Sequence, residues 1–529
     1  MPTDCISYQD SGYFTPLLID YLNRDEKLQS LYNRFPSLEN FAGQIAEKQT
    51  NYDDLNREVL VSVLRKQYET IETSDLTLGN IEALKASTTF TVTTGHQLNL
   101  FTGPLYFLYK IISTINLTKE LKAAYPAQNF VPVYWMATED HDFDEINYFN
   151  FKGKKFRWNR ESTGPVGRFS TEGLEDVFVA FSKELGIGKN AEALRALFEN
   201  AYLKYGNLAD ATRFLANDLF GSYGLVVLDA DDKNLKRLFV PYVKEELLHQ
   251  TSHKKVAETS TLLLDYKIQV NPREINLFYI EDDLRERIIL ENDMYIVNNT
   301  ELKFTEKELL EEVEHYPEKF SPNVIMRPLY QEVILPNLCY IGGGGELAYW
   351  LELKSYFDSA KVAFPVLLLR NSVLLATKKE AGKADKLGLT WSDLFLKPFD
   401  LKDKIIRKES GFELDFSEQK KFLQVQFDQL RAIAKRTDAS FIGAVNAQEA
   451  KQIKGLEHLE KRLIQAEKKQ HADVLHRICG LQNELFPNQG LQERMVNFSE
   501  FYLESGPDLI EKLFEVLKPL EDRFEVVVV

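Results

Sequence analysis

The sequence predicts an α/β protein with a parallel β-sheet core and a carboxyl-terminal α-helical antiparallel coiled coil. Three observations support this prediction: a strand, turn, helix and strand in succession over 89–137, a glycine-rich turn near 342–345, and a long helical repeat beyond residue 384. Strands that alternate with helices indicate parallel pairing, because a parallel crossover needs a long connection, usually a helix. Apolar residues spaced three and four apart over many turns are typical of coiled coils.

The first unit begins with a strand at 89–93, which is rich in β-branched residues, and runs into a glycine-bearing turn at 94–104. Pro104 is predicted to be the first helical residue, because its fixed φ and missing N–H suit that position, with Thr102 or Gly103 as the cap. Apolar residues then recur at helical spacing and predict a face that packs on a sheet: Leu105, Leu108, Ile112 and Ile115.

The second strand, at 130–137, is nearly all apolar, as expected for a parallel strand covered by helices, and it ends in an acid-rich run at 138–145. Ligands of open α/β sheets bind beyond the carboxyl ends of the strands, so the turn at 93–103 and the acid-rich run are expected to share one crevice. Free N–H groups at the helix start favour an anion such as phosphate. The spacing matches neither the dinucleotide fingerprint nor the phosphate-binding loop, so the pattern alone indicates only a generic nucleotide site.

The acid-rich run provides five candidates for holding magnesium, positioning an amine or acting as a base: Asp140, His141, Asp142, Asp144 and Glu145. Clustered carboxylates raise one another's pKa and bind cations. Acids at strand ends also cap helices, and a single histidine is more often a hydrogen-bonded fixture than a catalyst. A structural role therefore stays open for each of them.

A run of four glycines at 342–345 precedes a second helical pattern. Gly343 and Gly344 would let a ligand reach bare backbone at a helix start, although such runs also form tight turns. The buried strand predicted at 366–369 is followed by Arg370, and an arginine in that position pairs with phosphate or carboxylate.

Residues 1–88 have helical patterns, including a predicted apolar stripe of Leu55, Val59 and Val63. A further strand is predicted at 224–231, where Asp229 is a candidate ligand-facing residue. Short alternating strands, the first at 268–270, predict a small antiparallel insertion that extends to residue 297. Thr305 and Glu308 form a predicted capping box, and the apolar end of the chain predicts a terminal strand or docked tail.

The coiled-coil pattern consists of apolar residues amid dense Lys, Glu and Gln: Phe422, Val425, Leu430, Ile453, Leu456, Leu459, Leu463, Ala466, Val474, Ile478, Leu481 and Leu485. Two long antiparallel helices fit it, with a polar break at Gln470 as a four-residue slip in the heptad. So long a stripe would stay half exposed on a single chain. We therefore expect it to pair with a second copy as a homodimer.

The composition excludes several classes of function. A net charge of −16 in 529 residues disfavours a broad surface for nucleic acid or anionic membrane. We find no signal peptide and no apolar segment of transmembrane length, so a cytoplasmic location is expected. The three cysteines, Cys5, Cys339 and Cys479, lie far apart and predict neither a disulfide framework nor a zinc site.

Several ordered motifs resemble the bacillithiol biosynthesis cysteine-adding enzymes. They are Thr94-Gly95-His96-Gln97, Leu100 to Tyr106, Val131 to Trp135, Glu139 to Glu145, Arg327 to Glu332, Leu335 to Asn337, Tyr340 to Glu346 and Leu368 to Ser372. The resemblance spans most of the chain. Family members commonly read Thr-Gly-Gln-Gln-x-Gly in the first motif, whereas this chain has His96 and Asn99, which argues against His96 as an indispensable base.

The resemblance implies a Rossmann-like core with two connecting insertions, similar to class I aminoacyl-tRNA synthetases, and a coiled coil that dimerises. The core is predicted at 1–150, 221–240 and 321–384, the insertions at 151–220 and 241–320, the coiled-coil domain at 385–505 and a docking tail at 506–529. The implied activity joins L-cysteine to the amine of glucosaminyl malate. Making an amide from a free acid needs activation, so we expect ATP, with Mg²⁺ balancing its charge.

The predicted catalytic residues are Asp140, His141 and Asp142, and replacing Asp142 by asparagine is expected to remove activity. Substrate or nucleotide is predicted to bind at Gly95, His96, Gln97, Gly103, Asp144, Gly343, Gly344, Glu346, Arg370 and Asn371. Two rival functions stay open: another ATP-dependent ligase or nucleotidyltransferase on the same core, and a coiled-coil scaffold with a vestigial pocket. All of these predictions require the glycine turn, the acids and the four glycines to meet in one cleft.

Overall fold

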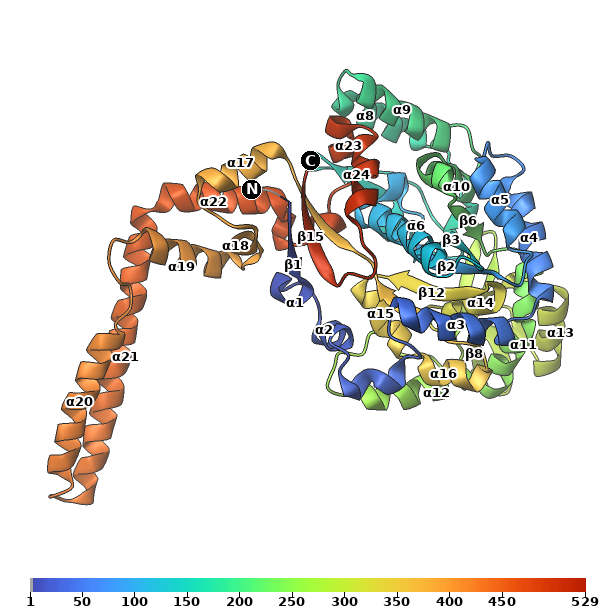
Figure 1. The fold of residues 1–529 in the computed structure, drawn as a ribbon. Coiled ribbons are helices and arrows are strands. Elements are labelled where there is room, and N and C mark those ends of the chain that lie inside the picture. Colours follow the sequence, from blue (N-terminus) through green and yellow to red (C-terminus); the bar gives the residue numbers. More distant parts are fainter. Residues whose placement is uncertain (1–2) are drawn as a thin grey trace.

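A five-stranded parallel sheet forms the centre of the computed structural model, which describes residues 3–529 and leaves Met1 and Pro2 of the predicted core segment outside the described residues (Figure 1). The strand order is β13-β12-β2-β3-β6, and every neighbouring pair is parallel. The strands are β2 (Thr89–His96), β3 (Asn129–Met136), β6 (Val226–Asp229), β12 (Asn337–Gly342) and β13 (Val366–Leu369). The predicted parallel core is confirmed.

Helices from distant parts of the chain cover this sheet. Helices α3 (Leu38–Asn51) and α6 (Tyr106–Ala124) share one apolar cluster with β2, in which Phe41 and Leu117 meet Phe90. Helix α4 (Leu55–Tyr68) buries Leu60, Val61 and Leu64. The predicted stripe on this helix is wrong at Leu55, which is 73% exposed.

The start of α6 differs from the prediction. The helix begins at Tyr106 rather than Pro104, after a 3-10 turn at Leu100–Thr102. Phe101 and Thr102 have φ of 49° and 67°, a conformation that is costly for non-glycine residues. The N–H of the buried Phe101 donates to the Tyr202 hydroxyl at 2.8 Å, so tertiary contacts override the local preference of Pro104.

Between β3 and β6 the chain forms the hairpin β4 (Tyr148–Phe151) and β5 (Lys154–Arg157), then helices α8 (Leu174–Leu185), α9 (Lys189–Tyr202) and α10 (Leu208–Phe220).

The antiparallel insertion is present as a five-stranded sheet in the order β10-β9-β8-β7-β11. It contains β7 (Leu277–Glu281), β8 (Leu284–Glu291), β9 (Met294–Val297), β10 (Lys303–Phe304) and β11 (Phe320–Pro322), and the capping box of α13 (Glu306–His315) is confirmed. The strand predicted at 268–270 is wrong. The N–H groups of Gln269 and Val270 donate to the Glu352 carboxylate, at 2.8 and 3.4 Å, rather than to a neighbouring strand.

The carboxyl-terminal part contains an antiparallel helical hairpin that projects from the body as an arm (Figure 1). It consists of α20 (Ser417–Ala434) and α21 (Ala439–Gln470). The break at Gln470 is confirmed in position, but it is a turn in the chain rather than a heptad slip. His471 has φ −99° and ψ 22°, and α22 (Ala472–Leu485) then packs against α17 (Lys378–Lys386) at the body end of the arm.

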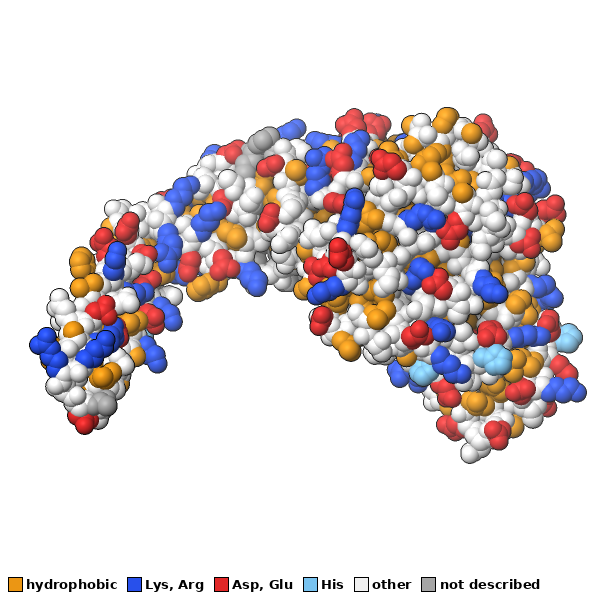
Figure 2. Space-filling view, turned by 60° about the horizontal axis from the view of Figure 1, so that its bottom comes forward, with side chains coloured by type: hydrophobic (Ala, Val, Ile, Leu, Met, Phe, Trp, Pro, Cys, Tyr) orange, Lys and Arg blue, Asp and Glu red, His pale blue; other side chains and the backbone are white. Residues whose placement is uncertain are grey.

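The hairpin buries a short seam of Phe427, Ala434 and Val445 between its helices. The predicted stripe residues Phe422, Val425 and Leu430 instead lie outside the seam, with 73%, 53% and 39% of their surface exposed. Figure 2 shows apolar side chains on the surface of the arm. An apolar face of this hairpin therefore has no cover from residues 3–529.

The end of the chain returns to the body. Strand β15 (Arg523–Val528) pairs in parallel with β14 (Ser372–Ala376) and antiparallel with β1 (Asp4–Ser7), which confirms the predicted terminal strand. Helix α24 (Asp508–Val516) packs on α6. Among the described residues, no helix is both long enough and apolar enough to cross a membrane.

Candidate functional site

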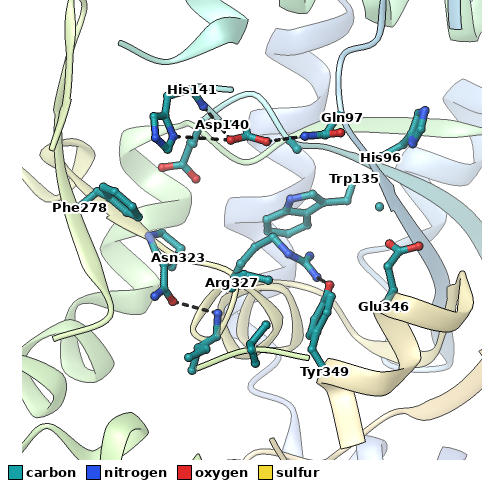
Figure 3. A pocket seen from close by; sticks show the side chains of 18 of the residues that line it. His96, Gln97, Trp135, Asp140, His141, Phe278, Asn323, Arg327, Glu346 and Tyr349 are labelled. Atoms are coloured by element: carbon teal, nitrogen blue, oxygen red, sulfur yellow. Dashed lines mark hydrogen bonds and ion pairs between the residues drawn. The ribbon is translucent and has the colours of Figure 1, made fainter. Parts of the chain in front are cut away.

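A cavity of about 950 Å³ opens at the carboxyl ends of β2, β3, β12 and β13 (Figure 3). The turn after β2, the acid-rich run after β3 and the glycine run after β12 all line it, as the sequence predicted. Its far wall comes from the second insertion. This volume lies in the range of sites that enclose small molecules and cofactors.

The structure brings most, but not all, of the predicted site residues together. Those that line the cavity are Gly95, His96, Gln97, Asp140, His141, Gly343, Glu346 and Arg370. Those that do not line it are Gly103, Asp142, Asp144, Gly344 and Asn371.

The residues outside the cavity have other neighbours. Asp142 is exposed, and Asp144 pairs with Arg157 at 2.5 Å. A Cβ on Gly344 would lie 2.9 Å from Leu18, so close packing with α2 (Pro16–Leu22) accounts for glycine at that position. Gly103, in the turn before α6, and Asn371 are held by the carboxyl-terminal part, through Asn497 and the carbonyl of Lys518 respectively.

Glu346 links the glycine run to the β2 turn. Its carboxylate accepts hydrogen bonds from the Gly343 N–H and the Tyr340 hydroxyl, each at 2.7 Å, and pairs with Lys110 at 2.6 Å. Lys110 also donates to the Gly95 carbonyl at 2.6 Å. Burial opposes ionisation of Glu346, but Lys110 and these donors hold its pKa below the usual value, so the carboxylate is charged at neutral pH.

Gly95 leaves room for this network. A Cβ at Gly95 would lie 3.2 Å from the Tyr340 hydroxyl. A larger side chain would therefore press on the group that donates to Glu346.

Asp140 occupies the opposite end of the cavity. Its Oδ2 accepts from the Gln97 amide at 2.9 Å, and its Oδ1 accepts from the His141 N–H at 2.8 Å. Arg285 of β8 donates to His141 Nδ1 at 2.6 Å and stacks 3.9 Å from the centre of the Phe278 ring. Because Nδ1 accepts from Arg285, the neutral imidazole carries its proton on Nε2.

The two histidines of the cavity are both held neutral at pH 7. Partial burial and the Arg285 guanidinium lower the pKa of His141 below its usual value. Burial and the Lys110 ammonium lower the pKa of His96 to about 3. His96 Nε2 is buried with no hydrogen-bond partner among the described residues.

A charge cluster lies behind the acid-rich run. Lys236 is buried between Glu139 and Asp231, at 2.6 and 2.8 Å. Asp229 accepts from the Thr138 hydroxyl at 2.5 Å and faces a separate hollow beside the cavity, so it does not line the predicted crevice. These pairs fix the end of β3 against α11 (Lys233–His249).

Among the lining residues that the sequence did not predict are Gln269, Arg285, Arg327 and Arg494. Arg327 is the first residue of one of the motifs that carry the family resemblance, so its place in that motif could have identified it as a site residue. Arg494 and the two residues from the second insertion have no local motif, since only tertiary folding places them at the cavity.

The described side chains of the cavity do not form a site that could hold a metal ion by themselves. Among the side chains of the described residues, no group of three or more His, Cys, Asp or Glu is placed to hold a metal ion. A single carboxylate such as Asp140 suits an ion that arrives with phosphate oxygens, because Mg²⁺ is usually held by one or two carboxylates together with substrate phosphates.

Comparisons with known proteins cover the full chain. The model "Bacillithiol biosynthesis BshC, N-terminal Rossmann-like domain" matches residues 1–371, and the model "Bacillithiol biosynthesis BshC, C-terminal coiled-coil domain" matches residues 373–529. A protein of Flavobacterium johnsoniae is 64% identical over 529 residues, covering 100% of both chains. One of Flavobacterium psychrophilum is 60% identical over 528 residues, covering 100% of this chain and 99% of the other.

More distant relatives match over nearly the same length. A protein of Bacillus mycoides is 29% identical over 532 residues, covering 94% of this chain and 95% of its own. All three relatives carry the name "Putative cysteine ligase BshC".

A solved structure described as a putative arginyl tRNA synthetase from Campylobacter jejuni is 10% identical, covers 88% of this chain and 98% of its own, and has a TM-score of 0.22, too low to support an argument. The family models confirm both the resemblance found in the motifs and the predicted combination of a Rossmann-like core with a coiled coil. The chain belongs to the bacillithiol biosynthesis BshC family.

Proposed function

We propose that this protein is a cysteine ligase that joins the carboxyl group of L-cysteine to the amine of glucosaminyl malate, forming bacillithiol. Family membership supports the reaction class, and the relatives' printed name supports cysteine as a substrate. The observation that carries the proposal is the convergence of three distant segments on one cavity, with the Asp140 carboxylate at one end and the Arg370 guanidinium at the other.

Amide formation requires that the amine lose a proton and that an oxygen leave the carboxyl carbon. A carboxylate oxygen is a poor leaving group at neutral pH, so ATP is proposed to supply the activation, as an acyl adenylate or an acyl phosphate. Asp140 would help to hold a magnesium ion bound with the nucleotide, and that ion would supply charge balance for the phosphates. The cavity would hold the activated carboxyl and the amine together, which raises their effective concentration.

Asp140 is proposed to accept hydrogen bonds from the incoming amine and to orient it. Its carboxylate is held by Gln97, so its position is fixed before substrate binds. His141 would donate from Nε2, because Arg285 occupies Nδ1. Asp142 stays a candidate at the rim of the acid-rich run.

The backbone at Gly343 and Gly345, together with Gly95, is proposed to contact substrate or nucleotide closely. Glu346 holds both loops in register through Lys110 and Gly343. Arg370 is proposed to contribute to binding an anionic group from the end of β13.

The test is a reaction of the purified protein with L-cysteine, glucosaminyl malate, ATP and Mg²⁺, followed by mass spectrometry of the thiol product. We expect bacillithiol, with ATP consumed in proportion. Product formed without ATP consumption would overturn the activation step and leave ligation intact. Product with another amino acid and none with cysteine would favour the rival ligase.

A further inference from the structure

The end of the cavity near Arg370 carries more positive charge than the neighbouring carboxylates neutralise. Four cationic side chains line it: Lys110, Arg327, Arg370 and Arg494. Lys110 pairs with Glu346 at 2.6 Å and Arg370 pairs with Glu493 at 2.6 Å. Two guanidinium groups are left without a carboxylate partner among the described residues, in a chain whose net charge is −16.

Arg327 is the more central of these two groups. It opens α14 (Arg327–Ile334), and its side chain projects into the cavity between Trp135 and Tyr349 (Figure 3). Its hydrogen-bond partners are neutral: the Gln331 side-chain oxygen at 3.0 Å and the Tyr349 hydroxyl at 3.3 Å. The rings of Trp135 and Tyr340 lie 5.7 and 5.6 Å from its central carbon, so aromatic contacts orient the guanidinium without cancelling its charge.

Arg494 reaches the cavity from the coiled-coil domain, at the end of the 3-10 turn η8 (Gln492–Arg494). The preceding residue, Glu493, anchors this turn. Its buried carboxylate accepts from Arg370 Nη2 at 2.6 Å and from the Ser372 hydroxyl and the Val373 N–H at 3.2 Å. Arg494 itself is exposed at the edge of the cavity.

Arg370 adds a donor to the same end. Its Nε is buried and has no acceptor in the part of the chain that the structure describes. A Cβ on Gly343 would lie 3.8 Å from this atom, which places the donor beside the glycine run. A buried N–H without an acceptor is costly, so a ligand oxygen at this position would restore the missing hydrogen bond.

We propose that Arg327 and Arg494, with the Nε of Arg370, form a subsite for a dicarboxylate, and that the dicarboxylate end of the acceptor occupies it. This inference rests on the proposed function. Two separate guanidinium groups match two carboxylates, since each can form a bidentate pair. A phosphate would be expected at the start of α15 (Gly344–Leu351), but the Glu346 carboxylate already accepts from the Gly343 N–H there at 2.7 Å.

The subsite fixes the orientation of the acceptor. With its carboxylates at Arg327 and Arg494, its amine extends toward the Asp140 carboxylate. Cysteine and the activating nucleotide then approach from the remaining walls. The coiled-coil domain takes part in substrate recognition, because Arg494 belongs to it.

Binding of L-malate to the full-length chain tests the subsite without requiring turnover. We expect calorimetric titration to give a malate affinity about 10- to 100-fold weaker in Arg327→Gln and in Arg494→Gln, the loss expected for one charge-assisted pair. Arg494→Lys should bind malate with intermediate affinity, because lysine keeps the positive charge but cannot form the bidentate hydrogen bonds of a guanidinium group. Arg477→Gln, an exposed position on α22 with the same change of charge, should bind as the wild type does.

Unchanged malate binding in Arg494→Gln would overturn the subsite, and this variant is informative because the side chain is exposed and its loss should leave folding intact. A parallel titration with inorganic phosphate should give the same affinity for the wild type and for every variant. An equal loss of phosphate and malate affinity would also overturn the proposal, since it would assign this end to the nucleotide. If malate binds as expected and no amide forms in the ligase assay, the proposed function fails and the subsite stands.

Discussion

At the scale of single residues, the cavity depends on a few charges held in place by neighbours from other segments. Glu346 and Lys110 are the clearest case, because each contacts a loop that the other does not: Gly343 for Glu346 and Gly95 for Lys110. The pair therefore joins two loops that are far apart in sequence. Both loops line the cavity.

Glu346→Gln should destabilise the protein, because Lys110 keeps its charge in a buried position and loses its partner. We expect a loss of about 1.5–3 kcal/mol in the free energy of unfolding, the range for a hydrogen bond to a charged group. Urea unfolding followed by circular dichroism measures it. Glu418→Gln, an exposed position on α20, is the matched control. Equal stability of the two variants would contradict the role given to the pair.

Asp140→Asn and Asp142→Asn separate two carboxylates that the sequence ranked equally. Asp140 lines the cavity and Asp142 does not. We therefore expect kcat/KM to fall about 100-fold or more in Asp140→Asn, which is the loss expected when a side chain that takes part in proton transfer is removed. The loss in Asp142→Asn should be clearly smaller, with the fold of both variants intact. An equal loss in both would restore the sequence prediction for Asp142.

At the scale of elements, the sequence predicted what depends on local pattern and missed what depends on tertiary contact. The apolar run of β3 and the capping box of α13 were read correctly, because each is determined by its own residues. The start of α6 was misplaced, because the Phe101 N–H finds a partner in α9. Residues 268–270 were predicted to form a strand because apolar and polar residues alternate there. They form a loop instead, since the Gln269 N–H donates to the Glu352 carboxylate rather than to a neighbouring strand.

Glu352 also makes this loop sensitive to pH. Burial raises the pKa of Glu352 to about 7, although the N–H groups of Gln269 and Val270 partly stabilise its charge. A raised carboxyl pKa means that the folded state binds the proton more tightly than the unfolded chain does. This contribution to stability is complete below the ordinary glutamate pKa and is lost as pH rises through about 7.

The wild type should therefore lose stability relative to Glu352→Gln as pH rises from 5 to 8, since glutamine cannot ionise. Urea unfolding at intervals across this range measures the difference. Gln269 and Val270 line the cavity, so ligand affinity should follow the same profile. Parallel stability curves for the two proteins would show that Glu352 does not titrate in this range.

At the scale of the whole molecule, the projecting arm has more apolar surface than its own seam covers. Phe422, Val425 and Ile433 of α20 are 73%, 53% and 56% exposed, while Phe441 and Leu459 of α21 are 48% and 52% exposed. Large apolar residues gathered on one projecting hairpin are typical of an interaction surface. We propose that a second copy of the chain covers it, as the sequence pattern predicted.

Light scattering coupled to gel filtration tests this pairing. We expect a dimer for the wild type and a monomer for the double variant Phe422→Glu with Val425→Glu, because burying two carboxylates in an apolar interface is costly. Gln424→Glu, an exposed position on the same helix, should stay dimeric. A wild type that remains monomeric at every concentration would contradict the pairing.

The sequence located the core strands, the coiled coil and eight of the cavity residues, because strand ends, glycine runs and heptads leave local signals. It did not locate Arg327 and Arg494 as a pair, since they lie 167 positions apart and belong to different domains. The sequence also predicted Asn371 and Gly344 as site residues. Their neighbours in sequence line the cavity, but these two residues pack against other parts of the chain. The predicted domain boundaries stay predictions.

A crystal structure of the protein with glucosaminyl malate measures directly where the acceptor binds. We expect its density in the cavity at the carboxyl ends of β2, β3 and β12, with the carboxylates at Arg327 and Arg494 and the amine within hydrogen-bond distance of Asp140. Density in another hollow, such as the one lined by Glu72, Lys204 and Asp218, with this cavity left empty, would contradict the assignment of the site.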